Sequence, residues 1–567
     1  MGRNGRGERE TPRFRHRNGP AGLMQILRPA DASLPCGPYV IRSNSTECAP
    51  EPIAPRAMPE TVLPTRIPTH GTRAERKRHL EALRSAFTGL DTEYPLADGS
   101  TARRTYLDSA ASNLRLTVAE NIVHRAMRHY ANTHSQLHFG ARIMTELYHR
   151  AHDIVGDFVD APDDYTVVFT GTGVTGGLNR MARVLADQRP QRDVVITTMM
   201  EHHANDLPHR KHAGTVVHVP LEKDPDGEAG RVDVEALQTA IHEHADRLNY
   251  VAITAASNVT GIINPVHEVA RLAHEVGALC VVDAAQSAAH LPLSVQGEAE
   301  AERLDVFCMS GHKIYAPGSP GVIVARKDLF QGLEPQEVGG GIVNRVETES
   351  YEIMDALPER EEAGTPNLPG AFLLAATLYL MGRIGMDVIE EDERALTQYA
   401  LERFAAIDGL HIYGSHRLEV ADRIGVITFN LDDLPHGLVT AILNDYFGIA
   451  VRNECFCAQP FVRQLLGRTG SGSANGTSAN GTGTGEECGP ETQPGMVRVS
   501  LGLYNTRADI DRAADALADI AARPDAYRQH YRPVLTGSGD WVHKRFSFAP
   551  DEAFVIEDEV DRWLENV

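Results

Sequence analysis

The chain of 567 residues and 61.9 kDa, with 42% apolar residues, is too long for one hydrophobic core and predicts two globular domains with appended segments. Its 77 acidic and 55 basic residues give a formal net charge of -22, which disfavours non-specific binding to nucleic acid or anionic membranes. No stretch approaches the ~20 consecutive apolar residues of a membrane-spanning helix, so we expect a cytoplasmic protein. The seven cysteines are sparse, odd in number and without paired metal-ligand spacing, so they indicate neither a disulfide framework nor a metal site.

The first segment, residues 1–75, is rich in Arg and Pro and has no sustained periodicity, which predicts a disordered N-terminal extension. Its Arg-rich opening imitates a transit peptide, but Glu8, Glu10 and the missing amphipathic stripe favour the disordered extension. An amphipathic helix is expected at about 79–90. It falls within an N-terminal segment, 76–120, that we expect to pack on the smaller domain.

The large domain is expected at 121–375, where short β-branched runs alternate with helical patterns. Such alternation predicts a mostly parallel sheet with helices on both faces. The expected strands span 166–169, 194–198, 250–254, 279–282, 304–309 and 321–325.

The C-terminal part of the chain has a more helical pattern, with strands expected near 426–430 and 497–501. This pattern predicts a small α+β domain at 376–525. Residues 467–495 are dominated by Gly, Ser and Thr and are expected to form a flexible insert in that domain. Residues 526–567 are expected to form a C-terminal tail.

A glycine-rich loop, GTGVTGG (171–177), follows the first large-domain strand and opens a helix. Unpaired backbone N–H groups and the positive helix end then face one spot, as a bound phosphate requires, and Thr175 can add a hydroxyl donor. The segment also matches the dinucleotide-binding pattern GxGxxG. A dinucleotide-binding loop and a plain strand-to-helix turn therefore both remain alternatives for this motif alone.

Two later strand ends carry Asp283 and, beyond the next strand, Lys313. A carboxylate can keep a pyridinium nitrogen protonated, and a desolvated lysine can form a Schiff base with the aldehyde of pyridoxal phosphate (PLP). Ser310 and His312 flank the lysine as candidate phosphate ligands, whereas a nicotinamide site has no use for it. Asp283 could instead cap a helix and Lys313 could be a solvated loop residue. Their joint order in the chain favours a PLP site.

A series of short motifs occurs in order between Tyr106 and Leu564: YLDSAA (106–111), FTGTGVTGG (169–177), EHHAN (201–205), SNVTG (257–261), DAAQ (283–286), SGHK (310–313), GTPN (364–367) and RVSLGLYNT (498–506). In these motifs the sequence resembles the class V aminotransferase-like enzymes of PLP fold type I, most closely the group II cysteine desulfurases and selenocysteine lyases. The resemblance implies an α/β fold with a mostly parallel seven-stranded sheet, a smaller α+β domain, and a homodimer.

The resemblance also implies roles for individual residues. Lys313 binds PLP covalently, His202 stacks on its ring and Asp283 holds the ring nitrogen, while Asn258 and Gln286 contact the ring hydroxyl. His202 and Asn258 could alternatively be satisfied polar residues of a sheet edge. The implied phosphate contacts are Gly173, Val174, Thr175, Ser310, His312 and, from the second subunit, Thr365.

The substrate side of the site is implied in the same way. Arg498 resembles the clamp for the substrate carboxylate, for which a planar guanidinium is well suited. Asn132 and His134 are implied to line the substrate mouth, although they could equally be surface polar residues. No metal is expected in this site.

The run RNECFCAQP (452–460) places Cys457 where these enzymes carry their catalytic cysteine. As a thiolate it would attack the sulfur of PLP-bound cysteine, leaving alanine and an enzyme persulfide for a sulfur-acceptor protein, as in iron–sulfur cluster assembly. Three features depart from the pattern: the residues 454–456 before the cysteine, Gly176 in place of a common acidic residue, and the 467–495 insert. Cys455 could be a resolving thiol, a second sulfur carrier or a passive residue.

Two alternative functions remain open at this point. The first is another PLP reaction, such as transamination, epimerisation or a selenocysteine or β-lyase step, that retains Lys313, Asp283 and Arg498 without using Cys457. The second is a non-catalytic scaffold or sulfur-relay protein with the same fold. The sequence does not distinguish among amino-acid substrates, because the same groups would serve all of them.

Overall fold

The computed structural model describes residues 67–133, 135, 137–432, 434–467, 494–534 and 539–566. The chain divides after Val62, and all described residues belong to the second unit, Leu63–Val567. Most of the predicted extension (1–75) and of the predicted insert (467–495) therefore lies outside the described residues, as does His134.

The main sheet has seven strands, in the spatial order β4 (Tyr165–Thr170), β12 (Gly321–Arg326), β11 (Val306–Ser310), β10 (Leu279–Asp283), β9 (Leu248–Thr254), β5 (Val194–Thr198) and β6 (Thr215–Val219). Within this sheet β12 runs antiparallel to both of its neighbours, and the other paired strands are parallel. The expected mostly parallel sheet is confirmed, and the expected strands match to within two residues at each end. The edge strand β6 was not predicted.

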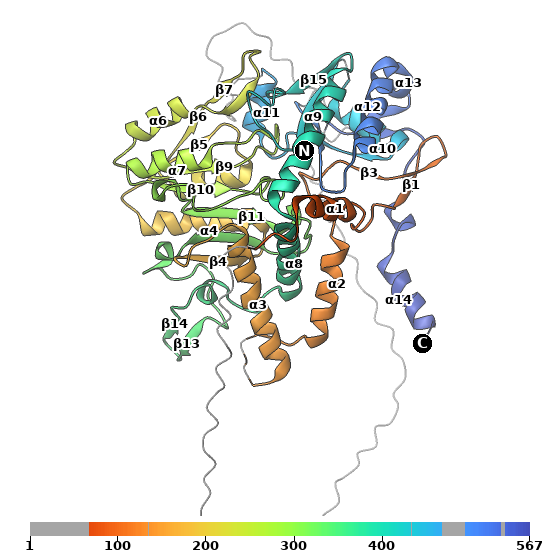
Figure 1. Ribbon diagram of the computed structural model, residues 1–567. Coiled ribbons are helices and arrows are strands. Elements are labelled where there is room, and N and C mark those ends of the chain that lie inside the picture. Colours follow the sequence, from red (N-terminus) through yellow and green to blue (C-terminus); the bar gives the residue numbers. More distant parts are fainter. Residues whose placement is uncertain are drawn as a thin grey trace, which may run out of the picture. The chain divides into compact units, whose positions relative to one another are not determined.

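Both faces of this sheet are covered by helices, and its central strands β9, β10 and β11 are buried along their whole length. Alternate residues of β4 point to opposite faces: Val167 and Phe169 join one core cluster, and Val168 joins another. The first cluster includes residues of α3 (Phe139–Phe158), α6 (Val234–Glu243), α7 (Val266–Glu275) and α8 (Leu368–Ile384). The second is built around α4 (Gly173–Gln188) (Figure 1).

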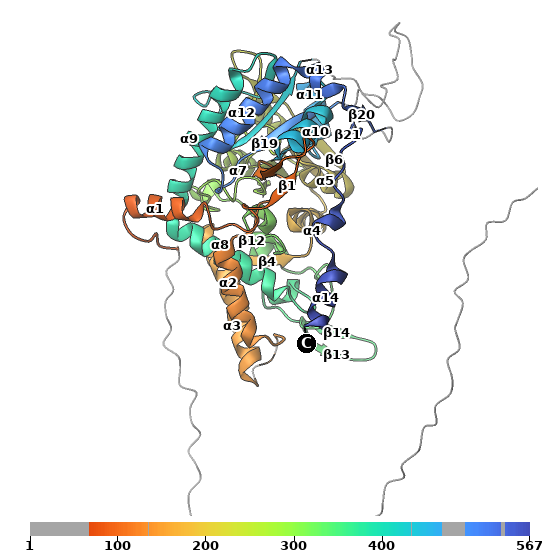
Figure 2. The ribbon, with the colours of Figure 1, turned by 90° about the vertical axis from the view of Figure 1, so that its right-hand side faces the viewer.

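The smaller sheet is antiparallel, in the order β15 (Leu410–Tyr413), β16 (Val426–Leu431), β19 (Met496–Ser500) and β18 (Arg452–Glu454). Three helices bury its apolar face: α9 (Met386–Ala405), α10 (His436–Phe447) and α12 (Arg507–Ala522). Figure 2 shows α9 and α12 side by side on this sheet. Its last two strands bring the segment before Cys457 next to the strand that carries Arg498.

The first described helix, α1, spans Arg73–Leu83, so the expectation of a helix at 79–90 was wrong at both ends. It begins earlier because Thr72 and Glu75 form a reciprocal capping box. The chain then pairs β3 (Thr105–Tyr106) in parallel with β17 (Ile449–Ala450), and α2 (Thr117–Ala126) packs on α8.

The remaining elements are short hairpins and helices. The paired strands are β1 (Glu93–Pro95) with β2 (Thr101–Arg103), β7 (Leu221–Lys223) with β8 (Ala229–Val232), β13 (Val343–Val346) with β14 (Tyr351–Ile353), and β20 (Tyr531–Pro533) with β21 (Trp541–His543). The helices are α5 (Leu207–His212), α11 (Gln459–Leu465), α13 (Pro524–Arg528) and α14 (Ile556–Glu565). No single helix among the described residues is both long and apolar enough to cross a membrane; α8 and α9 pass that test only as a pair bent by 82°.

Candidate active site

The glycine-rich loop joins β4 to α4 and lies against the ends of two neighbouring strands. Gly173 has φ +60°, a left-handed conformation that favours glycine. A Cβ on Gly321 would stand 2.3 Å from the Gly173 backbone, so the start of β12 can approach the loop only as glycine. The Val174 amide donates to the Ser310 hydroxyl over 2.7 Å and pins the loop to the end of β11.

Lys313 follows β11 in a short 3₁₀ turn, Gly311–Lys313, and Asp283 is the last residue of the adjacent strand β10. Burial lowers the pKa of the Lys313 amine to about 8, against the opposing charge of Asp283. In the part of the chain that the structure describes, this amine has no hydrogen-bond partner. Burial also raises the pKa of Asp283, although the Ala285 amide donates to its carboxylate over 2.9 Å and Lys313 favours its ionised form.

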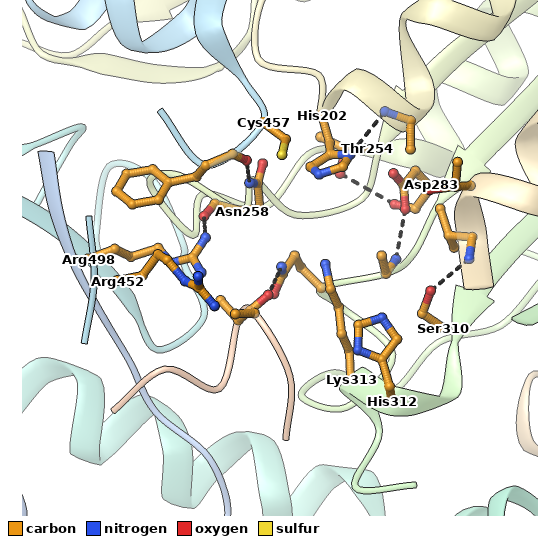
Figure 3. A pocket seen from close by; sticks show the side chains of 18 of the residues that line it. His202, Thr254, Asn258, Asp283, Ser310, His312, Lys313, Arg452, Cys457 and Arg498 are labelled. Carbon is orange, nitrogen blue, oxygen red and sulfur yellow. Dashed lines mark hydrogen bonds between the residues drawn. The ribbon is translucent and has the colours of Figure 1, made fainter. Parts of the chain in front are cut away.

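These groups surround a cavity of about 410 Å³ (Figure 3). Most of the residues predicted from sequence line it: Val174, Thr175, His202, Asn258, Asp283, Gln286, Ser310, His312, Lys313, Cys457 and Arg498. They come from both sheets and from loops far apart in the chain. The fold therefore brings the predicted cofactor, thiol and carboxylate-binding groups into one space.

Of the predicted residues that the structure describes, three do not line this cavity. Gly173 lies in the loop beside it, whereas Thr365 and Asn132 are exposed and outside it. Within a single chain, the structure therefore does not place Asn132 at the cavity mouth or Thr365 at the glycine-rich loop.

The His202 imidazole lies in the cavity wall, and its Nδ1 accepts a hydrogen bond from the Ala204 amide over 3.0 Å. Burial, with the positive charge of Lys313, lowers the pKa of His202 to about 3, so the ring is neutral at physiological pH. The pKa of His312 is lowered to about 4 by the same two causes.

The amide side chains of Asn258 and Gln286 bond to backbone carbonyls at the cavity wall. Asn258 Nδ2 donates to the Phe456 carbonyl over 2.7 Å, and Gln286 Nε2 donates to the Ala110 carbonyl over 2.8 Å. Both side chains therefore also hold neighbouring loops in place.

Cys457 lies in a tight turn in which the Ala458 amide donates to the Cys455 carbonyl over 2.8 Å. Phe456 and Cys457 have φ values of 50° and 56°, and Glu454 before them has φ 91°. Left-handed conformations are unfavourable for residues with a Cβ, and such strain is often found at functional sites. The turn leaves the Cys457 thiol exposed and free of any disulfide, at the edge of the cavity.

Arg498, on β19, is 3% exposed, and its guanidinium lies 4.7 Å from the centre of the Phe456 ring. Its Nη1 donates to the Asn258 carbonyl over 3.0 Å, while Nη2 lies 3.4 Å from Asp108 Oδ1. The buried Nε has no hydrogen-bond partner among the residues that the structure describes. Burial lowers the pKa of Arg498 to about 10, so the group remains charged at neutral pH and can bind a carboxylate.

Behind the cavity, Glu201 is 4% exposed and accepts hydrogen bonds from Thr198 Oγ1, Asn205 Nδ2 and the Thr254 amide over 2.6, 2.7 and 3.1 Å. Burial raises its pKa to about 8. Glu201 thus ties the loop that carries His202 to the end of β9.

Sequence reasoning assigned no role to Glu201, Asp108 or Arg452, although all three lie within recognised motifs. The available signal was the presence of a charged side chain within each of these motifs.

The seven-stranded sheet and this cavity define an α/β enzyme whose site lies where parallel strands end. A family model described as Aminotransferase class-V matches residues 105–513. The chain belongs to this family.

Curated relatives and solved structures carry more specific names. A probable cysteine desulfurase of Halalkalibacterium halodurans is 34% identical over 419 residues, which cover 73% of this chain and 92% of the relative. One from Staphylococcus aureus is 34% identical over 435 residues, covering 75% and 94%. The apo cysteine desulfurase of Thermococcus onnurineus superposes with a TM-score of 0.62 at 28% identity, covering 74% of this chain and 95% of that one. Escherichia coli CsdA, in an S-sulfonic acid form, gives 0.61 at 28% identity, covering 78% and 98%.

Proposed function

We propose that this protein is a PLP-dependent cysteine desulfurase that converts L-cysteine to L-alanine and holds the released sulfur on Cys457 as a persulfide. The observation that carries the proposal is that Lys313, Cys457 and Arg498 line a single cavity. A lysine for the cofactor, a guanidinium for the substrate carboxylate and an exposed thiol for its sulfur are the three groups this reaction needs. The names of the relatives support the same assignment.

The residues around the cavity fit PLP. Lys313 supplies an amine that makes no hydrogen bond to any described residue and that has a pKa of about 8. Asp283 supplies a carboxylate that is 2% exposed, where a charged ring nitrogen would compensate its burial. The glycine-rich loop supplies the start of a helix, where Thr175 lines the cavity and can offer its hydroxyl to a phosphate. When bound, PLP withdraws electrons from the substrate carbons and so lowers the barrier to breaking their bonds.

The protein's own groups orient the substrate and move its atoms. Arg498 binds the α-carboxylate, which directs the substrate sulfur toward Cys457. The Cys457 thiolate attacks that sulfur: an S–S bond forms, the C–S bond breaks and its electron pair remains on the substrate carbon. Lys313 Nζ takes and returns protons at the substrate carbons. The balanced result is alanine and Cys457 persulfide from cysteine and Cys457 thiol.

The proposal includes a homodimer in the cytoplasm. Thr365 is exposed and lies outside the cavity of its own chain, which is consistent with a phosphate contact made to the second subunit. The exposed position of Cys457 suits transfer of its persulfide to an acceptor protein, with iron–sulfur cluster assembly as the expected use.

The test is release of alanine and sulfide from L-cysteine with added reductant, compared between the wild type, Lys313→Ala and Cys457→Ser. Release by the wild type alone supports the proposal. Turnover that persists in Cys457→Ser would exclude the persulfide and favour a different class V reaction.

A further inference from the structure

A second thiol, Cys455, lies two residues before Cys457 in the same tight turn. The Ala458 amide closes this turn on the Cys455 carbonyl over 2.8 Å, and Phe456 and Cys457 occupy its two central positions. Even a fully extended chain spans no more than about 7 Å over two residues. The Cα atoms of the two cysteines therefore lie within the distance that a bond between two cysteine side chains can bridge.

The two thiols have different surroundings. Cys457 is exposed and lines the active-site cavity (Figure 3), whereas Cys455 does not line it. Cys455 is half-buried and packs against an apolar cluster that includes Phe461 and Met496. Its Sγ donates to the Pro494 carbonyl over 3.2 Å. A substrate held in the cavity can therefore present its sulfur to Cys457 but not to Cys455.

The resting Cys455 thiol is a weak nucleophile. Burial is the main cause that raises its pKa, and the charge of Glu454 adds to this effect, although Arg463 lowers the pKa. The thiol is therefore protonated at neutral pH, and in this form it donates to Pro494. Only its small thiolate fraction can attack another sulfur. A persulfide on the neighbouring cysteine offsets that small fraction through proximity.

We propose that Cys455 is a second sulfur carrier, which takes the outer sulfur of the Cys457 persulfide and frees Cys457 for another turnover. The inference rests on the proposed function, because desulfuration supplies the persulfide. The Cys455 thiolate attacks the outer sulfur and forms a new S–S bond, while the old S–S bond breaks and leaves its electron pair on Cys457. The proton given up by Cys455 passes to the Cys457 thiolate. No oxidant or reductant is consumed, because one persulfide replaces another.

This exchange increases the sulfur that each subunit can hold when no acceptor is present. The equilibrium need not favour Cys455, because the next desulfuration refills Cys457 and prevents the sulfur from returning. Each subunit should then release a second alanine before turnover stops.

The test counts turnovers in the absence of acceptor and reductant. The PLP-loaded protein is mixed with a small excess of L-cysteine, and the burst of alanine is measured after rapid quenching. The amplitude should be about twice that of Cys455→Ser, because one further sulfur is stored. Cys455→Ala is the second variant and should match Cys455→Ser. Every protein in the series, including the parent, carries serine in place of three other cysteines: Cys36, Cys48 and Cys488.

Mass spectrometry after alkylation locates the stored sulfur, because fragment ions on either side of Phe456 separate the two cysteines. The parent protein should carry a persulfide on both, and Cys457→Ser should carry none on Cys455. A burst no larger than that of Cys455→Ser would overturn the inference. So would a disulfide between Cys455 and Cys457 with release of sulfide, which would make Cys455 a resolving thiol.

A failure of the proposed function gives a different result. A parent protein that makes no alanine from L-cysteine would contradict the proposed function alone, and inorganic tetrasulfide would then supply sulfur to the exposed Cys457. Persulfide on Cys455 that depends on the presence of Cys457 would uphold the inference. Sulfur confined to Cys457, or equal loading of Cys455 in Cys457→Ser, would overturn it.

Discussion

The backbone amide of His203 donates a hydrogen bond to the carbonyl oxygen of Cys457 over 2.7 Å. This bond joins the loop after β5, which carries His202, to the turn that presents the thiol. The second anchor of the turn is Asn258, whose amide nitrogen bonds to the Phe456 carbonyl. The position of Cys457 therefore depends on contacts with two loops that follow strands of the main sheet, and not on its own turn alone.

Replacing Asn258 with Ala should destabilise the protein, because the buried Phe456 carbonyl loses its donor. We expect the free energy of unfolding to fall by about 1–3 kcal/mol, measured by urea denaturation of the PLP-free protein. Asn453→Ala is the control, since among the described residues the hydrogen-bond contact of its side chain is a long one of 3.4 Å to His436. This change should cost about 0.5 kcal/mol or less. Equal losses in the two variants would argue against Asn258 as an anchor.

Replacing Glu454 with Gly should stabilise the protein. Glu454 has φ 91°, which a side chain disfavours and glycine adopts freely, so relief of this strain should add about 1 kcal/mol to the free energy of unfolding. Asn453, its neighbour on β18, does not have a positive φ, and Asn453→Gly should lose about 1 kcal/mol. Thermal unfolding of both variants would check the opposite signs, and a less stable Glu454→Gly would show that its side-chain contacts outweigh the strain.

The rate at which PLP loads onto the apo-protein should rise with pH and level off above a midpoint near 8, the pKa of Lys313. Only the neutral amine attacks the aldehyde. The charge of Asp283 raises this pKa and that of Arg498 lowers it, so Asp283→Asn should move the midpoint to lower pH and Arg498→Gln to higher pH. The measurement is stopped-flow absorbance across a pH series; a midpoint at the ordinary lysine value of 10.5 would refute the effect of burial.

A buried cluster at the end of β4 should make stability depend on pH. His152 Nε2 lies 2.9 Å from Glu362 Oε1, and Tyr148 also donates to this carboxylate. The charge of Glu362 raises the pKa of His152 against the effect of burial. A group with a raised folded-state pKa adds stability that is full below its unfolded pKa and disappears as pH rises through the folded value.

We therefore expect the wild type to lose about 1–2 kcal/mol of unfolding free energy between pH 6 and pH 9 relative to His152→Gln, which does not titrate there. Denaturant unfolding at several pH values measures the difference. Parallel curves for the two proteins would show that folding does not raise the pKa of this histidine.

The strands and the residues that end them were predictable because buried β-branched runs are short and clearly bounded. Asp283, Ser310 and Lys313 could be assigned to one site because parallel strands place their carboxyl ends at the same edge of a sheet. The start of α1 was misjudged because the cap at Thr72 lies outside the apolar pattern that suggested the helix.

The proposed cofactor-binding half of the site was predictable from the sequence, because Asp283 and Lys313 each follow a strand and their joint order along the chain indicates one site. The contact of Asp108 with Arg452 and Arg498 depends on the tertiary structure. Asp108 and Arg498 are 390 residues apart, and they meet because β3 pairs with β17 and Asp108 bridges to Ser500 on the strand that bears Arg498. No local pattern encodes such a contact, because its energy comes from the register of strands that the folded chain brings together.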